Sequence, residues 1–310
     1  MGNRPRVTVL GSLNMDISVT VPRLPEPGAT VLGSPARFTP GGKGANQAVA
    51  AARLGGDVLM AGCVGDDDFG RQLEAALDAE GIDASHVRVT TTAPTGLAMI
   101  SVDQAGENMI TVASGANHEV GEAEVAAAAA RPGDTLVLCA EIPVSAIVAA
   151  LARSAARRIL NLAPAPDHPA AIVRRSPGPD WLVVNETEAA AVLGRPVDGL
   201  AEAAQAAAAL TAMGPRHAVV TAGAHGVALA APGLTRAIEA FRVEAVDTVG
   251  AGDTFVGALA VALAAGVPAA EAVRAAAAAG ATAATRPGAQ AGMPHPADIR
   301  AATGLTWPVS

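Results

Sequence analysis

The residues best suited to chemistry lie between Val246 and Phe255. Two glycines, Gly250 and Gly252, lead directly into a carboxylate, Asp253. Apolar β-formers precede them, and apolar residues recur at every fourth position after them. The pattern predicts a strand over residues 241–246, a tight glycine turn, and a helix that carries Asp253 in its first turn.

This predicted turn suits an anion. A helix N-terminus has unpaired N–H groups and the positive end of the helix dipole, and glycines let an anion approach them closely. Asp253 beside such a site suits a base that deprotonates a hydroxyl while a phosphoryl group is transferred to it. The plainer alternative is an aspartate that caps a helix after a glycine loop. The stretch by itself favours neither.

A second glycine-rich stretch, Gly41-Gly42-Lys43-Gly44-Ala45-Asn46-Gln47, opens another predicted helix. Its glycines permit close backbone approach, and Asn46 offers both a donor and an acceptor, as a sugar with several hydroxyls requires. It has neither the residue order of a Walker P-loop nor the third glycine of a dinucleotide fingerprint. A structural glycine turn is the alternative.

Four further polar side chains are placed to bind hydroxyls. Asn14 and Asp16 lie two residues apart, so they share one face of a predicted strand. That face binds a ligand if it lines a cleft and is ordinary surface if it does not. Glu141 follows the predicted strand 136–139, and Asn161 ends the next strand in the same way.

Two loops follow predicted strands at the edge where α/β sheets bind ligands. Asn185 and Glu188 come after the strand 181–184, and they form either a helix-capping box or a site that organises water and Mg²⁺ near phosphates. The other loop is a simple β-turn or a nucleotide-lining loop. Its residues are Thr221, Ala222, Gly223, Ala224, His225 and Gly226.

The elements that must position these residues alternate between strand and helix. This rhythm predicts an α/β fold with a mostly parallel central sheet covered on both faces, in one domain over residues 1–310. Excursions at about 14–40 and 90–112 look antiparallel and half-exposed, and we interpret them as a small β lid. The predicted strands are 7–10, 14–21, 30–38, 58–64, 87–91, 97–102, 108–112, 136–139, 159–162, 181–184, 217–221 and 227–230.

Composition excludes several classes of function. The chain has 310 residues, of which 51% are hydrophobic, and a net charge of −8 without a basic run, so nucleic acid and anionic membranes are poor partners. Two cysteines in apolar runs predict buried free thiols, and the histidines lack metal-ligand spacing. No signal-peptide pattern opens the chain, and the apolar run 255–267 is too short to span a membrane. We expect a cytoplasmic protein.

Six stretches in chain order resemble the ribokinase-like family of sugar and nucleoside kinases, nearly from end to end. The resemblance implies a three-layer α/β/α fold with a β-sheet lid. Within the family, the stretch 41–48 is similar to that of kinases that act on ribose. The six stretches are 11–16, 41–48, 65–67, 161–165, 185–188 and 247–255.

The resemblance also implies roles for particular residues. Asp253 would take the proton from the primary hydroxyl of ribose, while the amides of Gly250, Ala251 and Gly252 hold the transferring phosphoryl group. Asn14, Asp16, Gly41, Gly42, Lys43, Asn46 and Glu141 would bind the sugar. Asn185, Thr221, Ala222, Gly223, Ala224, His225, Gly226 and Gly252 would bind the nucleotide, and Glu188 would act through Mg²⁺. Asp247, Val249, Ala283, Arg286, Gly288 and Gly292 would surround a potassium ion.

The implied reaction is transfer of the γ-phosphoryl group of ATP to O5 of D-ribose, which gives ribose 5-phosphate. Mg²⁺ would accompany ATP, K⁺ would activate, the lid would close to exclude water, and the exposed lid face would form a homodimer. Kinases for fructose, adenosine or pseudouridine are alternatives. A nucleoside kinase should offer its base an apolar or aromatic platform, and Phe38 is the only aromatic residue in either excursion. A more distant alternative, a non-catalytic sugar-binding regulator, should lack Asp253.

Overall fold

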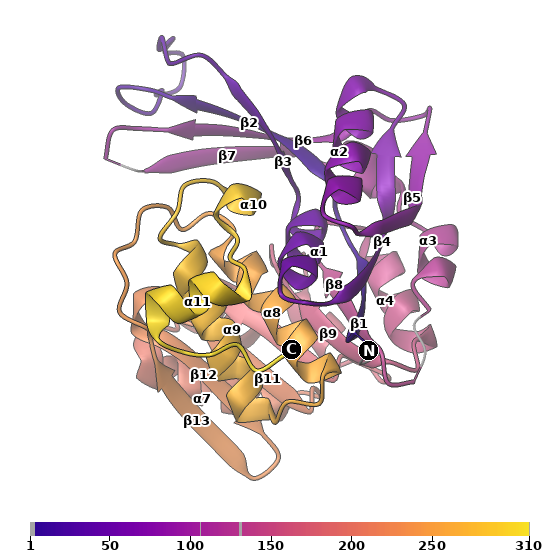
Figure 1. The fold of residues 1–310 in the computed structure, drawn as a ribbon, viewed down its shortest axis with the longest axis vertical. Coiled ribbons are helices and arrows are strands. Elements are labelled where there is room, and N and C mark those ends of the chain that lie inside the picture. The colour runs from indigo at the N-terminus through magenta and orange to yellow at the C-terminus, as the bar shows by residue number, and fades with distance from the viewer. Residues whose placement is uncertain (1–3, 106, 130–131, 310) are drawn as a thin grey trace.

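A computed structural model describes residues 4–105, 107–129 and 132–309, and these residues form two β-sheets (Figure 1). In the described chain the larger sheet has nine strands in the order β13-β12-β11-β10-β9-β8-β1-β4-β5, and the smaller has four in the order β3-β2-β6-β7. The large-sheet strands are β1 (Arg6–Leu10), β4 (Asp57–Gly65), β5 (Asp83–Thr90), β8 (Thr135–Cys139), β9 (Arg157–Asn161), β10 (Trp181–Asn185), β11 (His217–Thr221), β12 (Gly226–Ala231) and β13 (Leu234–Glu239). The small-sheet strands are β2 (Asn14–Thr20), β3 (Arg37–Gly41), β6 (Gly96–Val102) and β7 (Asn108–Ala113).

The large sheet is parallel from β5 to β11, and β12 and β13 extend it with antiparallel pairs at one edge. Its central strands are continuous apolar runs because helices cover both faces. β8, for example, is buried at all of its positions. Cys63 and Cys139 are buried free thiols on β4 and β8, as predicted. The mostly parallel α/β sheet expected from the sequence is confirmed.

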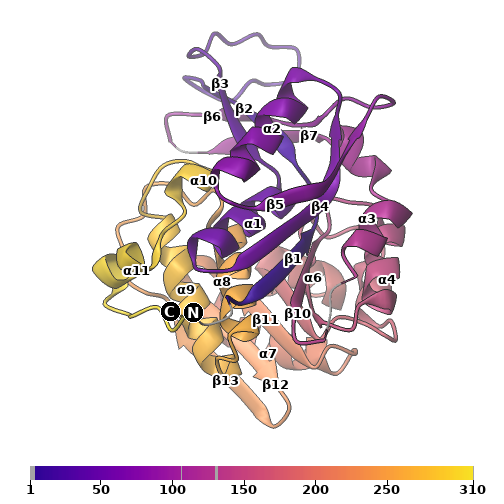
Figure 2. The same cartoon turned by 45° about the vertical axis from the view of Figure 1, so that its right-hand side comes forward.

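Helices form a layer on each face of this sheet (Figure 2). Side chains that alternate along each strand separate into two clusters, one shared with α1, α2, α8 and α9 and the other with α3 to α7. None of the helices in the described part is long and apolar enough to cross a membrane. The helices are α1 (Lys43–Arg53), α2 (Asp68–Ala79), α3 (Glu122–Ala127), α4 (Val144–Arg153), α5 (Pro169–Val173), α6 (Glu186–Leu193), α7 (Gly199–Thr211), α8 (Ala251–Ala264), α9 (Ala269–Ala283), α10 (Ala289–Gly292) and α11 (Pro296–Thr303), with 3₁₀ turns at Gly115–Glu119 and Gly223–His225.

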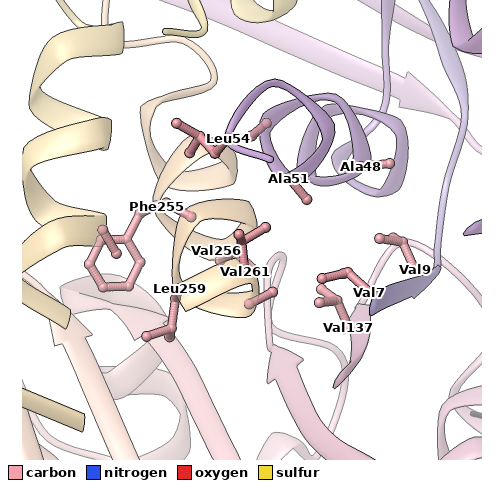
Figure 3. Close-up of a cluster of buried hydrophobic side chains, with 14 of the residues drawn as sticks. Val7, Val9, Ala48, Ala51, Leu54, Val137, Phe255, Val256, Leu259 and Val261 are labelled. Carbon is pink, nitrogen blue, oxygen red and sulfur yellow. The ribbon is translucent and has the colours of Figure 1, made fainter. Parts of the chain in front are cut away.

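Helix α8 is the most buried helix near the predicted chemistry. Every residue from Asp253 to Leu263 is buried, which is the pattern of a helix surrounded by protein. Figure 3 shows its apolar side chains between Leu54 of α1 and the sheet. A Cβ at Gly257 would lie 2.5 Å from the carbonyl oxygen of Gln47, so the two helices touch backbone to backbone. This contact, within about the first two turns of each helix, brings the starts of α1 and α8 close together.

The small sheet projects away from the main body (Figure 1). β2 pairs with β3, and β6 with β7, in antiparallel register, as the sequence predicts for each excursion. The two excursions meet through a parallel pairing of β2 with β6, for which no prediction was made. The reason is that β1 and β5 run parallel in the large sheet, so the strands that follow them leave it in the same direction.

Two predicted strands are wrong. No strand forms over 241–246; the chain forms the unpredicted β13 instead and then runs irregularly to α8, with Val246 64% exposed. Apolar β-formers without a neighbouring strand to pair with do not make a strand. In place of the strand expected over 30–38, a shorter strand, β3, forms from Arg37 to Gly41. Pro35, which has no N–H to donate, precedes the paired segment.

Candidate active site

The carboxylate of Asp253 is held from both sides. Asp253 is the third residue of α8, after the N-cap Gly250, so it does not cap the helix and the capping alternative is wrong. Its Oδ2 accepts a hydrogen bond from Nδ2 of Asn46 at 3.0 Å, and its Oδ1 accepts one from Nε2 of Gln47 at 3.0 Å. The buried carboxylate therefore has a fixed orientation at the start of a buried helix.

The N-terminus of α8 offers free amides beside this carboxylate. Gly250 has φ of +77°, and a Cβ there would lie 2.9 Å from Cα of Ala289, so the turn requires glycine. Among the described residues, the amides of Gly252 and Asp253 have no acceptor, whereas the amide of Ala251 donates to the Thr248 carbonyl at 3.2 Å. The first turn thus presents the unpaired amides that the predicted anion site requires, whereas the Ala251 amide, also predicted to hold the phosphoryl group, is used within the turn.

Glu141 is attached to the start of α1. Its Oε2 accepts hydrogen bonds from Oγ of Ser12 at 2.5 Å and from the amide of Lys43 at 3.2 Å. Oγ of Ser12 in turn accepts from the amide of Gly44 at 3.3 Å. A carboxylate at a helix N-terminus is stabilised by the helix dipole. The loop after β8 is thereby fixed to the glycine-rich stretch.

Asp16 and Lys43 face the same space as Glu141 and Asp253. Burial raises the pKa of Asp16 to about 7, the negative charges of Glu141 and Asp253 add to this, and Lys43 opposes it. The pKa of Lys43 is raised, mainly by Asp253, although burial acts in the opposite direction. A Cβ at Gly41 would lie 2.2 Å from Oδ2 of Asp16, so only glycine leaves room for this carboxylate.

Asn14 lies two residues before Asp16 on β2 and is buried. Its Oδ1 accepts a hydrogen bond from Nδ2 of Asn117 at 2.7 Å. Asn117 also donates to the Leu13 carbonyl and accepts from the Leu13 amide. The side chain of Asn14 is thereby oriented by a residue that is distant in sequence. Gly42, at φ +88°, packs against Asn14 and completes this group of predicted sugar ligands.

The buried charge of Asp16 predicts a pH-dependent stability. Because the folded protein holds the Asp16 proton up to about pH 7 and the unfolded chain loses it near the ordinary pKa of 3.8, the Asp16 carboxylate destabilises the fold increasingly as pH rises through this window. Asp16→Asn should therefore raise the melting temperature clearly at pH 8 and less at pH 5. Differential scanning fluorimetry at the two pH values measures this. An equal gain at both, or a loss at pH 8, would contradict it.

The second group of predicted residues lies farther along the same sheet edge. Asn185 and Thr221 are register partners on β10 and β11. Oδ1 of Asn185 accepts from the Glu188 amide at 2.8 Å, and Oε2 of Glu188 accepts from the Asn185 amide at 2.8 Å, which confirms the capping-box interpretation. Burial raises the pKa of Glu188. The loop Ala222–Gly226 closes with a hydrogen bond from the Ala222 amide to the Gly226 carbonyl, and Gly223, Ala224 and His225 are exposed.

The third group surrounds the turn that precedes α8. Asp247 accepts from the amide of Gly288 at 2.8 Å and from that of Val249 at 3.0 Å, and its own amide donates to the Ala284 carbonyl. A Cβ at Gly292 would lie 3.1 Å and 3.2 Å from the carbonyl oxygens of Arg286 and Ala283, so these two oxygens converge on one point. The structure thus gathers all six residues that were predicted to bind potassium. The described residues contain no group of three or more His, Cys, Asp or Glu placed to hold a metal.

Four residues of the site were not singled out from the sequence: Ser12, Gln47, Asn117 and Gln290. Ser12 and Gln47 lie inside two of the family-like stretches, so the motif residues beside them could have indicated that they belong to the site. Asn117 lies in a 3₁₀ turn and Gln290 in the short helix α10, and no spacing pattern marks either. Nε2 of Gln290 donates to Oδ1 of Asn46 at 3.1 Å, which fixes the direction of the Asn46 amide.

Known proteins resemble the chain over nearly its whole length. A family model described as pfkB family carbohydrate kinase matches residues 4–296. Ribokinase of Haemophilus influenzae is 38% identical over 299 residues, which cover 94% of this chain and 96% of that protein. A deoxyribokinase of Salmonella typhi is 33% identical over 82% of this chain and 84% of its own length. The structure of Arabidopsis thaliana ribokinase complexed with ribose and ATP has a TM-score of 0.86 at 30% identity, and the match covers 98% of this chain and all of that one.

The chain therefore belongs to the pfkB family of carbohydrate kinases. Members of this family use ATP to phosphorylate their acceptors. The fold class expected from the sequence resemblance, with a large mostly parallel sheet and a separate small one, is that of the solved ribokinase structures.

Proposed function

We propose that this protein transfers the γ-phosphoryl group of ATP to O5 of D-ribose, giving ribose 5-phosphate and ADP. The observation that carries the proposal is the buried carboxylate of Asp253, held by Asn46 and Gln47 beside free helix amides and facing Asp16 and Lys43. Ribokinases among the relatives support ribose as the acceptor.

In the proposed reaction, Asp253 accepts the proton of the O5 hydroxyl as the O5–P bond forms. The bond from phosphorus to the bridging oxygen of ATP breaks, and ADP leaves. The free amides of Gly252 and Asp253 stabilise the charge that develops on the phosphoryl oxygens. Because little covalent chemistry falls to the protein, positioning of the two substrates supplies most of the rate.

The sugar is proposed to lie among Asn14, Asp16, Gly41, Gly42, Lys43, Asn46 and Glu141. These residues offer carboxylate and amide groups for several hydroxyls, and none provides the flat apolar surface that a nucleobase requires. The nucleotide is proposed to lie between Asn185 and the loop from Thr221 to Gly226. The small sheet would act as a lid that excludes water from the reaction.

Two cations fit this arrangement. Both oxygens of Glu188 already accept hydrogen bonds from Asn185, so this carboxylate would reach Mg²⁺ through water rather than directly. Carbonyl oxygens are the ligands that a hard monovalent cation prefers, and those of Ala283 and Arg286 converge beside Gly292. We propose that K⁺ binds here with Asp247, Val249 and Gly288. A bound K⁺ would supply positive charge near the N-terminus of α8.

An acceptor panel tests the proposed function. We expect ADP release with MgATP to be fastest with D-ribose, slower with 2-deoxyribose, and near background with fructose, adenosine and pseudouridine. Replacing KCl by NaCl should lower the ribose rate. A higher kcat/KM for a nucleoside or for 2-deoxyribose would overturn the choice of acceptor while leaving the family intact.

We further propose that the small sheet forms a homodimer. Five of its apolar side chains are about half exposed, and the edge strand β7 is exposed throughout, which is unusual for a sheet without a partner. A second copy of the chain would cover this surface. The five side chains are Phe38, Met99, Met109, Ile110 and Val112.

Sedimentation velocity tests the dimer. Wild-type protein should sediment as a dimer, and the triple variant Met109→Thr, Ile110→Thr and Val112→Thr should sediment as a folded monomer, because it removes apolar contacts from both faces of β7. A dimer that is unaffected by these changes would place the interface elsewhere.

A further inference from the structure

A directed chain of side-chain amides leads from the large sheet to the carboxylate of Asp253. Asn161, the last residue of β9, donates from Nδ2 to the Val183 carbonyl at 3.2 Å. Oδ1 of Asn161 accepts from Nε2 of Gln47 at 3.0 Å. The same Nε2 donates to Oδ1 of Asp253 at 3.0 Å. Gln47 thus connects a sheet strand to the proposed base.

The direction of this chain is fixed by its first member. A backbone carbonyl only accepts, so the Val183 oxygen requires the NH₂ group of Asn161, and the oxygen of Asn161 must then point to Gln47. Gln47 consequently presents its NH₂ group, whose two hydrogens reach Asn161 and Asp253. Because Nε2 only donates, Oδ1 of Asp253 can only accept from it.

The second oxygen of Asp253 also accepts a hydrogen bond from a side-chain amide. Oδ2 accepts from Nδ2 of Asn46, and the amide of Asn46 is directed by Gln290. The main chain of Gln290 is anchored, because its backbone carbonyl accepts from Nη1 of Arg53 at 2.6 Å. Both carboxylate oxygens therefore meet side-chain amide donors that are hydrogen-bonded to further residues. With a donor directed at each oxygen, the carboxylate is placed to accept hydrogen bonds rather than to donate one.

Glutamine would be an unfavourable residue at position 47 if its side chain only packed in the core. The residue is fully buried, and its Oε1 has no hydrogen-bond partner in the described structure. A buried acceptor without a partner costs stability, whereas an aliphatic side chain of the same length would not. A glutamine at this place is therefore explained better by what its NH₂ group does to Asp253.

We infer that Gln47 is a positioning residue that holds Asp253 in the acceptor-only state and orientation needed to take the hydroxyl proton. This inference rests on the proposed function, because it assigns Gln47 to the base of that reaction. Asn161 acts only through Gln47. The charged groups that also face Asp253 are Lys43 on α1, Asp16 on β2 and Glu188 on α6, and none of them lies in this chain of amides.

The test is a pH profile of kcat for full-length Gln47→Met, with D-ribose and MgATP saturating. Met keeps the length of the side chain and removes both donors. We expect kcat at pH 7.5 to fall roughly tenfold or more, KM values for both substrates to change less than about threefold, and the acid limb of the profile to move about one unit to higher pH. Gln47→Glu, which brings a second carboxylate to Asp253, should move that limb farther.

Two comparisons exclude a merely structural effect. Gln205→Met, the same exchange at an exposed site on α7, should leave kcat and its pH profile unchanged. Asn161→Leu should reduce kcat less than Gln47→Met, and the double variant should equal Gln47→Met alone, because Asn161 has no separate route to Asp253.

Either of two results would overturn the inference: an acid limb that stays in place in Gln47→Met, or a double variant whose losses simply multiply. A fall in kcat with the limb in place would mean that Gln47 only supports packing. If wild-type protein fails to phosphorylate ribose, the proposed function fails first. The Gln47 series is then run on whichever acceptor the panel identifies, and the same profile decides it.

Discussion

Asp253→Asn should lower kcat by about 10³-fold, because it removes the only proposed acceptor for the hydroxyl proton. The substitution also creates a local conflict. The two oxygens of Asp253 now accept from Asn46 and Gln47, and an amide at this position must turn an NH₂ group toward one of those donors. Lys43 would at the same time lose the charge that contributes most to its raised pKa. Initial-rate assays with saturating D-ribose and MgATP measure the loss.

The control for this variant is substrate binding. Ribose is proposed to be held mainly by Asn14, Asp16, Lys43 and Glu141, which keep their side chains, and Asn46 is the one proposed ligand that bonds to the substituted residue. Isothermal titration should therefore give a ribose Kd within about threefold of wild type. A kcat within tenfold of wild type would show that Asp253 is not the base. A ribose Kd raised as much as kcat is lowered would show instead that Asp253 mainly binds the sugar.

Gly252→Ala should lower activity strongly without lowering the stability of the fold. A Cβ at Gly252 meets no atom within 4 Å, and the residue is helical without a left-handed φ, so alanine introduces no strain. Replacing glycine by alanine in a helix contributes about 0.5–1 kcal/mol of stability. The methyl group, however, occupies open space at the N-terminus of α8, where the phosphoryl group must approach the amides. We expect kcat to fall roughly 10²-fold, the scale of one lost oxyanion donor.

Two measurements on the same protein decide this prediction. Thermal melting should give a midpoint equal to or above that of wild type, and the initial rate should show the loss. A strong loss of both would mean that the residue is structural. Unchanged activity would mean that the phosphoryl group does not lie at this helix end, and the proposed anion site would have to be abandoned.

Local sequence signals predicted most of the large sheet. β8 and β10 are short apolar runs bounded by polar or breaking residues, and such runs are buried whatever their partners. The signals failed where the outcome depends on a neighbour distant in sequence. Residues 241–246 have strand-forming side chains but no strand beside them, and β13 forms because β12 offers it an edge. The parallel pairing of β2 with β6 also follows from the large sheet, not from either strand.

The residues of the predicted site also divide into those that local sequence signals reveal and those that depend on neighbours distant in sequence. Asp253 was predicted because a carboxylate after two glycines at a helix start has a chemical meaning, and Lys43 was predicted because its stretch resembles that of the ribokinase-like kinases. Asn117 and Gln290 were not, because each acts by holding one amide of another residue 103 and 244 positions away. Such contacts leave no pattern within a single sequence. The direction of the amides around Asp253, which decides what the carboxylate can do, is visible only in three dimensions.

The most direct test of the central claim is the position of the new phosphate on the product. We predict that the purified protein, incubated with MgATP, KCl and D-ribose labelled with ¹³C at C5, gives ADP and ribose 5-phosphate, with the ¹³C5 signal split by ³¹P. Asp253→Asn under the same conditions should give no such signal within the time in which the wild type reaches completion. Phosphorus coupled to any other carbon, or an unsplit C5 signal with ATP consumed, would contradict the account.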